Sequence, residues 1–401
     1  MLAKVFNFKN TSGSHQMDKL IYMDHAATTP VDPEVVAAML PFFSNEYGNP
    51  SSIHRWGQRA DYAITTAREE IAGILCCEAD EIIFTSCGSE SNNLALRGIA
   101  LEARELNKGN HLIISAIEHP AILRTAQQLQ NHYAFDVTIL PVDQHGFISP
   151  KDLKNVIQPD TFLVSVMYAN NEIGVIQPIA ELAAITREHN ILFHSDAVQA
   201  AGQLSLDTEK LGVDLMSVSA HKFYGPKGVG LLYAKRNTLS HSHQTGGSQE
   251  NGLRAGTQNV PLIVGMATAL KIVAGRQSHD NSKMKVLRDK LIEAVLDDIS
   301  ESILTGHRTC RLPNNASFAF EGIDGNELIM HLDLLNVAAS SGSACKTGSP
   351  EPSNVLTALD LSPKLSLGSL RLSLGRDTKD SDIEYIQQVL PKVVNNMRGI
   401  L

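Results

Sequence analysis

The chain has 401 residues, of which 43% are hydrophobic and 19% charged, a composition typical of globular proteins rather than disordered ones. This length suits two domains better than a single core. The formal charge of −9 argues against nucleic acid or an anionic membrane as the main partner. No apolar run approaches the ~18–20 residues that a membrane helix needs.

The N-terminal segment and the cysteines indicate the compartment. Residues 1–16, MLAKVFNFKNTSGSHQ, lack the apolar core and the cleavage site of a signal peptide, and they contain no arginine, so organelle targeting is not expected. The five cysteines are odd in number and irregularly spaced, unlike a secreted disulfide framework. The adjacent pair Cys76-Cys77 lacks the CxxC spacing of a zinc or redox motif. We therefore expect a cytoplasmic protein without a metal site.

Strand-like and helical patterns alternate through the first two thirds of the chain. Strands are predicted at 81–86, 111–115, 135–142, 161–168, 191–196, 214–219 and 228–234, with helices at 91–106, 120–133 and 179–190. Several of these strands are apolar at consecutive positions, as strands buried on both faces are. The alternation predicts an α/β fold with a mostly parallel seven-stranded sheet between helices.

A helix predicted over 260–275 closes this alternation, and a smaller α+β unit follows. Its predicted elements are a helix near 283–299, a strand near 315–320, a helix near 325–335 and a last helix near 380–398. We predict a large domain of residues 29–275 and a small domain made of 1–28 and 276–401.

Residues 338–353, AASSGSACKTGSPEPS, are small, polar and rich in glycine and proline, which predicts a mobile loop in the small domain. We expect Met330 and Leu332 before this loop, and Val355 and Leu356 after it, to be anchored in the small domain.

Two predicted strands end in residues that can carry chemistry. Lys222 follows a buried strand in SVSAHKFYGPKGVG, at the sheet edge where α/β folds bind ligands. A partly desolvated lysine there can form a Schiff base with an aldehyde, although most lysines are solvated surface residues. Asp196 ends the strand run ILFHSD, 26 residues before Lys222. It can cap the next helix or face the ring nitrogen of pyridoxal phosphate (PLP).

Two further segments complete the pattern. In FTSCGSESNN (84–93) a strand gives way to a helix, whose N-terminus together with Ser89 can hold a phosphate; Ser89 can equally be a helix N-cap. Cys345 lies between Gly342, Ser343, Ala344 and Thr347, where packing does not require a cysteine. The neighbouring Lys346 favours the thiolate, so Cys345 is a candidate nucleophile.

These groups, in this order, resemble the class V aminotransferase-like, fold-type-I pyridoxal enzymes, and within them the cysteine desulfurases of the IscS and NifS kind. The resemblance runs from about residue 21 to about 394. It is carried by YMDHAATTPVDP, YGNPSSIH, IEHPAI, ANNEIGVIQPI, DAVQ, SAHKFYGPKG, RAGTQNV, SSGSACKTGSPEPS and SLRLSLGR.

The resemblance implies a role for each matching residue. Lys222 is the lysine that binds PLP covalently, and His119 stacks on the cofactor ring and transfers protons. Asp196 pairs the ring nitrogen, while Gln199 and Asn171 hold the phenolic oxygen side. The phosphate cup consists of Gly88, Ser89, Ser219 and His221, completed by Thr257 of a second subunit in a homodimer. Arg371 clamps the substrate carboxylate, and Cys345 takes the sulfur.

The implied reaction removes sulfur from L-cysteine, giving L-alanine and a persulfide on Cys345. A sulfur-acceptor protein, such as an iron–sulfur scaffold or a tRNA-thiolation relay, then receives the sulfur. The alternatives are a selenocysteine lyase or a cystine C–S lyase on the same scaffold. A third is a catalytically idle pyridoxal protein that acts as a binding module.

Overall fold

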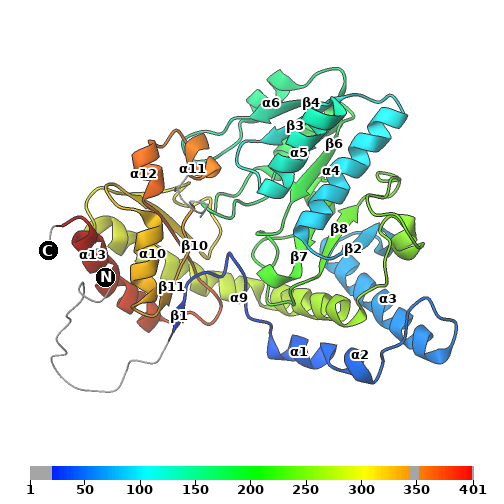
Figure 1. The fold of residues 1–401 in the computed structure, drawn as a ribbon, viewed down its shortest axis with the longest axis horizontal. Coiled ribbons are helices and arrows are strands. Elements are labelled where there is room, and N and C mark those ends of the chain that lie inside the picture. The colour runs from blue at the N-terminus through cyan, green and yellow to red at the C-terminus, as the bar shows by residue number, and fades with distance from the viewer. Residues whose placement is uncertain (1–19, 343–351, 400–401) are drawn as a thin grey trace.

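The computed structural model describes residues 20–342 and 352–399, so Cys345 and its neighbours from 343 to 351 lie outside the described residues. Within the described part, a large α/β unit and a smaller unit lie side by side (Figure 1). None of the helices in these two ranges combines the length and apolarity that a membrane crossing requires.

All seven strands predicted for the large unit are present in one sheet. They are β2 Ile82–Thr85, β3 His111–Ser115, β4 Asp136–Leu140, β5 Thr161–Ser165, β6 Leu192–Asp196, β7 Leu215–Ser219 and β8 Gly230–Ala234. The strand order is β2-β8-β7-β6-β5-β3-β4, and β8 runs antiparallel to both of its neighbours. The predicted mostly parallel sheet is therefore confirmed.

Successive side chains of a strand pack into the hydrophobic cores on opposite faces of the sheet, which explains why the strand sequences are apolar without interruption. In β3, Leu112 and Ile114 pack with helices α4 (Gly88–Glu105) and α5 (Pro120–Tyr133). Ile113 faces the opposite way and packs in the cluster that contains α3 (Arg55–Leu75), α7 (Ile179–Glu188) and the first half of α9 (Val260–Asp298). The sheet is thus covered by helices on both faces.

The remaining elements of the large unit are short. They are α1 Pro33–Met39, α2 Pro41–Ser44, α6 Pro150–Val156, α8 Thr208–Leu211 and the 3-10 turns η1 Ala79–Glu81, η2 Ala220–Lys222 and η3 Gln249–Gly252. Of these, η2 positions the site, because it follows β7 directly and ends at Lys222.

The smaller unit contains two small sheets and the C-terminal helices. Its elements are β1 Ile21–Tyr22, β9 Ser302–Leu304, β10 Asn315–Phe320, α10 Gly325–Asp333, β11 Val337–Ala338, α11 Asn354–Ala358, α12 Pro363–Leu367, β12 Ser369–Ser373 and α13 Asp380–Met397. Strands β12, β10 and β9 form an antiparallel sheet, and β1 pairs with β11 in parallel. The predicted α+β character is confirmed.

The predicted break between helices near residue 275 is wrong, because α9 is one helix of 39 residues. Residues 276–282, between the two predicted helices, are polar, but they are helical and their side chains have partners on α9 or on neighbouring segments. Arg276 Nε pairs with Asp280 Oδ2 one turn later at 3.2 Å, and Asn281 Nδ2 donates to Gln203 O at 2.7 Å. The predicted domain boundary therefore falls inside α9, which contributes to both hydrophobic cores, and the two-domain division stays a prediction.

The prediction of anchors in the small domain is only partly right. Leu332 is buried in the core of the smaller unit, whereas Val355 and Leu356 are buried in a cluster with Ile117 and Ile173 of the large unit. Met330 is 62% exposed. On α10, Leu328 and Leu332 are four residues apart and face the core together. Met330 lies half a turn from both and therefore points away from the core.

Candidate active site

A cavity of about 290 Å³ lies where β6 and β7 end, α4 begins and β12 of the small unit approaches. The carboxyl ends of parallel strands are where α/β sheets bind ligands. Ten of the twelve predicted site residues line this cavity: Gly88, Ser89, His119, Asn171, Asp196, Gln199, Ser219, His221, Lys222 and Arg371.

The Lys222 amino group is held at the cavity wall by main-chain oxygens. Its Nζ donates to the carbonyl oxygens of Ala26 at 2.6 Å and Ala27 at 2.7 Å, and Gln199 Nε2 donates to the same Ala26 oxygen at 2.9 Å. Burial and the nearby Arg371 lower the pKa of Lys222 to about 8. A neutral amine, the form that reacts with aldehydes, is therefore accessible near neutral pH.

Asp196 is buried at the end of β6, and both of its oxygens have partners. Asn92 Nδ2 from the first turns of α4 donates to Oδ2 at 2.7 Å, and the backbone N–H of Val198 donates to Oδ1 at 3.0 Å. The side-chain oxygen of Asn92 is buried without a partner among the described residues. These contacts fix the direction of a carboxylate that opens onto the cavity.

The N-terminus of α4 reaches the cavity through Gly88. A Cβ on Gly88 would lie 2.6 Å from Val198 Cγ2, so only glycine permits this close approach. The helix begins at Gly88 with Cys87 as its N-cap, so the predicted N-cap role of Ser89 is wrong; Ser89 is the second helical residue. The first N–H groups of a helix have no partner within it and attract anions, which suits a phosphate.

Two histidines border the cavity. His119 caps the N-terminus of α5, where its Nδ1 accepts from the N–H of Ala121 at 3.1 Å. Partial burial of the ring lowers the pKa of His119; Asp196 opposes this effect and Lys222 adds to it. Burial, with Lys222 and Lys227 nearby, lowers the pKa of His221 to about 4. Both rings are therefore neutral at pH 7.

Arg371 enters the cavity from β12 of the small unit. Its Nη2 forms an ion pair with Asp24 Oδ1 at 2.7 Å, and its Nη1 donates to the backbone oxygen of Asn171 at 2.9 Å. The Nε atom is buried and has no partner among the residues that the structure describes. The planar guanidinium, held from two sides, suits a carboxylate ligand.

Two predicted site residues are not in this cavity. Thr257 is exposed in the segment before α9, and Cys345 lies outside the described residues. Four further contributors to the site were not predicted from sequence: Asn92, Asp24 and the carbonyls of Ala26 and Ala27. Asn92 lies one helical turn after Gly88, a spacing that places both on one face of α4 and so could have indicated it.

The donor set fits PLP better than it fits a metal ion. A reactive lysine, a fixed carboxylate, neutral histidines and a helix N-terminus that begins with a closely packed glycine surround one cavity of small-molecule size. Across residues 20–342 and 352–399, there is no group of three or more His, Cys, Asp or Glu side chains that could hold a metal ion.

Comparisons with known proteins point the same way. Residues 21–386 match the family model "Aminotransferase class-V". The chain is 46% identical over 384 residues to the cysteine desulfurase IscS of Dictyoglomus turgidum, covering 96% of this chain and 97% of that protein.

Solved structures agree in fold and sequence. A NifS-like protein superposes with a TM-score of 0.88 at 35% identity, over 94% of this chain and 100% of that one. A structure described as SspA in complex with cysteine gives a TM-score of 0.77 at 37% identity, over 89% and 99% of the two chains. The chain therefore belongs to the class-V aminotransferase family, among its PLP-dependent cysteine desulfurases of the IscS and NifS kind.

Proposed function

We propose that the cavity around Lys222 binds PLP and L-cysteine, and that Cys345 accepts the substrate sulfur as a persulfide. The observation that carries this proposal is that ten residues, predicted from separate segments of the sequence, line one cavity. The cysteine bound in the SspA structure supports the substrate, since that protein shares 37% of its residues with this chain.

The residues divide into those that hold the cofactor and those that act on the substrate. Lys222 would bind PLP covalently, with His119 against the ring, Asp196 at its nitrogen, and Asn171 and Gln199 on the oxygen side. The phosphate would lie on Gly88, Ser89, Ser219 and His221 at the start of α4 and the end of β7. When bound, PLP withdraws electrons from the α-carbon of the amino acid, and a carboxylate opposite its ring nitrogen strengthens this effect.

The chain's own groups supply the proton transfers and the nucleophile. Arg371 binds the substrate carboxylate, and Lys222, whose pKa is lowered to about 8, takes the α-proton as a neutral amine. His119, whose pKa is lowered by burial, would shuttle a proton as a neutral base. The Cys345 thiolate attacks the substrate sulfur, so an S–S bond forms and the C–S bond breaks. The bonding electron pair stays with the carbon skeleton, which becomes L-alanine after protonation.

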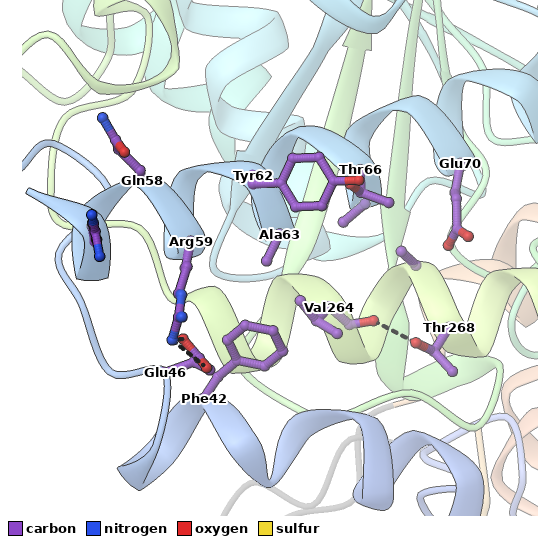
Figure 2. Close-up of a pocket in the computed structure, with 13 residues that line it drawn as sticks. Phe42, Glu46, Gln58, Arg59, Tyr62, Ala63, Thr66, Glu70, Val264 and Thr268 are labelled. Atoms are coloured by element: carbon purple, nitrogen blue, oxygen red, sulfur yellow. Dashed lines mark hydrogen bonds and ion pairs between the residues drawn. The ribbon is translucent and has the colours of Figure 1, made fainter. Parts of the chain in front are cut away.

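A homodimer is part of this proposal. Six large apolar side chains between residues 40 and 62 are more than half exposed: Leu40, Phe43, Tyr47, Ile53, Trp56 and Tyr62. One of them, Tyr62, also lines a second, larger cavity of about 680 Å³ between α2, α3 and α9, and none of the predicted site residues lines that cavity (Figure 2). Soluble monomers rarely leave so many apolar groups uncovered on one stretch.

A second copy of the chain would cover this surface and bring its Thr257 to the phosphate end of the cavity. Sedimentation at micromolar concentration should show a dimer. We expect the interface of such a stable dimer to bury more than ~2,000 Å² in total. A monomer with full cofactor occupancy would contradict the proposal.

The central test compares Cys345→Ser with Cys310→Ala, which removes an exposed free cysteine. Sulfide and alanine are measured from L-cysteine with a reductant present. We expect Cys345→Ser to bind cofactor and cysteine but to lose sulfide release, because an alcohol is a far poorer nucleophile toward sulfur than a thiolate. Cys310→Ala should retain release. Near-normal release by Cys345→Ser would instead favour a direct lyase that needs no persulfide.

The same protein is proposed to pass its sulfur to an iron–sulfur scaffold or a tRNA-thiolation relay. The name IscS of its relatives supports the first of these. Incubation of the persulfide form with candidate acceptors, followed by mass measurement of each acceptor, tests the transfer.

A further inference from the structure

Glu172 lies beside the cavity but does not line it. Its backbone is fixed on both sides: its N–H donates to Asn170 Oδ1 at 2.8 Å, and its carbonyl oxygen accepts from Asn315 Nδ2 at 3.0 Å. Gly174, at a φ of 74°, closes the turn, and a Cβ there would lie 2.6 Å from the Asn315 side chain. Glu172 therefore projects from a rigid turn directly after Asn171, one of the residues that line the cavity.

The carboxylate of Glu172 binds the C-terminal end of the segment that carries Cys345. Ser353 Oγ donates to Glu172 Oε2 at 2.5 Å, and the same Ser353 oxygen caps α11 by accepting from the N–H of Val355 at 3.1 Å. Val355 and Leu356 pack with Ile173 in one buried cluster. The residue after Glu172 and the helix after the segment are thus held together by apolar packing as well as by the hydrogen bond.

The N-terminal end of the segment meets the same carboxylate. A Cβ on Gly342 would lie 2.7 Å from Glu172 Oε2 and 3.4 Å from Ser353 Cβ, so the Gly342 backbone lies directly against both residues. Its N–H donates to Ser369 Oγ at 3.0 Å. Two residues earlier, Ser340 exchanges backbone hydrogen bonds with Arg371. Both ends of residues 343–351 therefore converge on one glutamate, next to the strand that carries Arg371.

We propose that Glu172 is a positioning residue that holds both ends of the cysteine-bearing segment at a fixed place relative to Asn171 and Arg371. The inference rests on the proposed role of Cys345. Burial raises the pKa of Glu172 to about 7, while the Ser353 hydroxyl and Arg371 act in the opposite direction. The position of a buried carboxyl group depends strongly on its hydrogen-bond donor. The test therefore removes the hydrogen bond between Ser353 and Glu172.

The experiment uses the holoenzyme of four variants: Glu172→Ala, Glu172→Gln, Ser353→Ala and Ser362→Ala. Ser362 is the matched control, because it caps the five-residue helix α12 as Ser353 caps the five-residue helix α11, without touching Glu172. Three quantities are measured: the kcat of sulfide release with the KM for L-cysteine, the persulfide formed per chain in a single turnover, and the rate of tryptic cleavage after Lys346.

We expect Glu172→Ala and Ser353→Ala to lower kcat about tenfold, the order of effect of losing one hydrogen bond to a charged group, while KM changes by less than about twofold. Cleavage after Lys346 should accelerate in both variants and persulfide yield should fall. Glu172→Gln keeps an oxygen that can accept from Ser353, so its kcat, persulfide yield and cleavage rate should lie close to those of the wild type. Ser362→Ala should match the wild type in all three.

Equal kcat and equal cleavage in Ser353→Ala, Glu172→Ala and Ser362→Ala would overturn the inference. That result differs from a failure of the proposed function, which would appear as normal sulfide release by Cys345→Ser.

Discussion

Glu118, a buried residue directly before His119, should make the free energy of unfolding depend on pH. It is 2% exposed, and only its Oε1 has partners, accepting from Ser115 Oγ and from the N–H of Met167, both at 2.7 Å. Oε2 has no partner among the described residues. Burial raises the pKa of Glu118 from 4.5 to about 8, with a smaller contribution from Asp196, against the lowering effect of the two hydrogen bonds.

The sign of the effect follows from which state holds the proton. Between pH 4.5 and pH 8 the folded protein keeps Glu118 protonated, whereas the unfolded chain has lost that proton. Stability from this group is therefore fully present below pH 4.5 and is lost as the pH rises through 8. At about 1.4 kcal/mol per pH unit, the wild type should lose about 2 kcal/mol of unfolding free energy from this group between pH 6 and pH 8.

Glu118→Gln removes the titration and keeps an oxygen for both hydrogen bonds. Urea unfolding, followed by the fluorescence of Trp56 and by circular dichroism, should show that the variant lacks about 2 kcal/mol of the wild-type loss between pH 6 and pH 8. Glu181→Gln, a change of an exposed glutamate on α7, should leave the wild-type pH dependence intact. Identical losses in wild type and Glu118→Gln would show that Glu118 is already ionised at pH 6.

Three further changes test the cofactor and substrate contacts. After borohydride treatment and denaturation, the wild type should retain PLP, seen as added mass on the peptide that contains Lys222, whereas Lys222→Ala should retain none. Added mass on any other peptide would show another attachment site. Gly88→Ala should weaken PLP affinity at least about tenfold, because its Cβ would meet Val198 Cγ2 at 2.6 Å. Gly73→Ala, in open space on α3, should leave affinity unchanged and stabilise the helix by about 0.5–1 kcal/mol. Arg371→Lys should raise the KM for L-cysteine about tenfold or more, since an ammonium group cannot replace the bidentate guanidinium; an unchanged KM would place the substrate carboxylate elsewhere.

The large unit could be predicted from sequence because each of its signals is local. Strands buried on both faces have uninterrupted apolar sequences, and all seven were predicted within three residues of their observed ends. The long helix α9 could not be predicted whole. Some partners of its polar middle, among them the carbonyl of Gln203, belong to segments distant in sequence.

The site shows the same division between local and distant signals. Lys222, Asp196 and Gly88 each follow a strand, so their place at one sheet edge could be predicted. Glu172 has no such local signal, and the signal for Asn92 is only its spacing of one helical turn from Gly88. Asn92 orients Asp196 from 104 residues away, and Glu172 accepts its hydrogen bond from Ser353, 181 residues later.

The placement of Arg371 relative to Lys222 shows how such distant contacts produce a working site. Arg376, from the same SLRLSLGR stretch, forms an ion pair with Asp32 at the start of α1 at 2.5 Å. Its guanidinium lies 4.1 Å from the ring centre of Tyr224, and the backbone N–H of Arg376 donates to the Tyr224 hydroxyl oxygen at 2.8 Å. Tyr224 is only two residues beyond Lys222, so the turn that presents the lysine is tied to the strand that presents the substrate clamp. The positions of Lys222 and Arg371 relative to each other are therefore fixed by a second arginine that does not line the cavity.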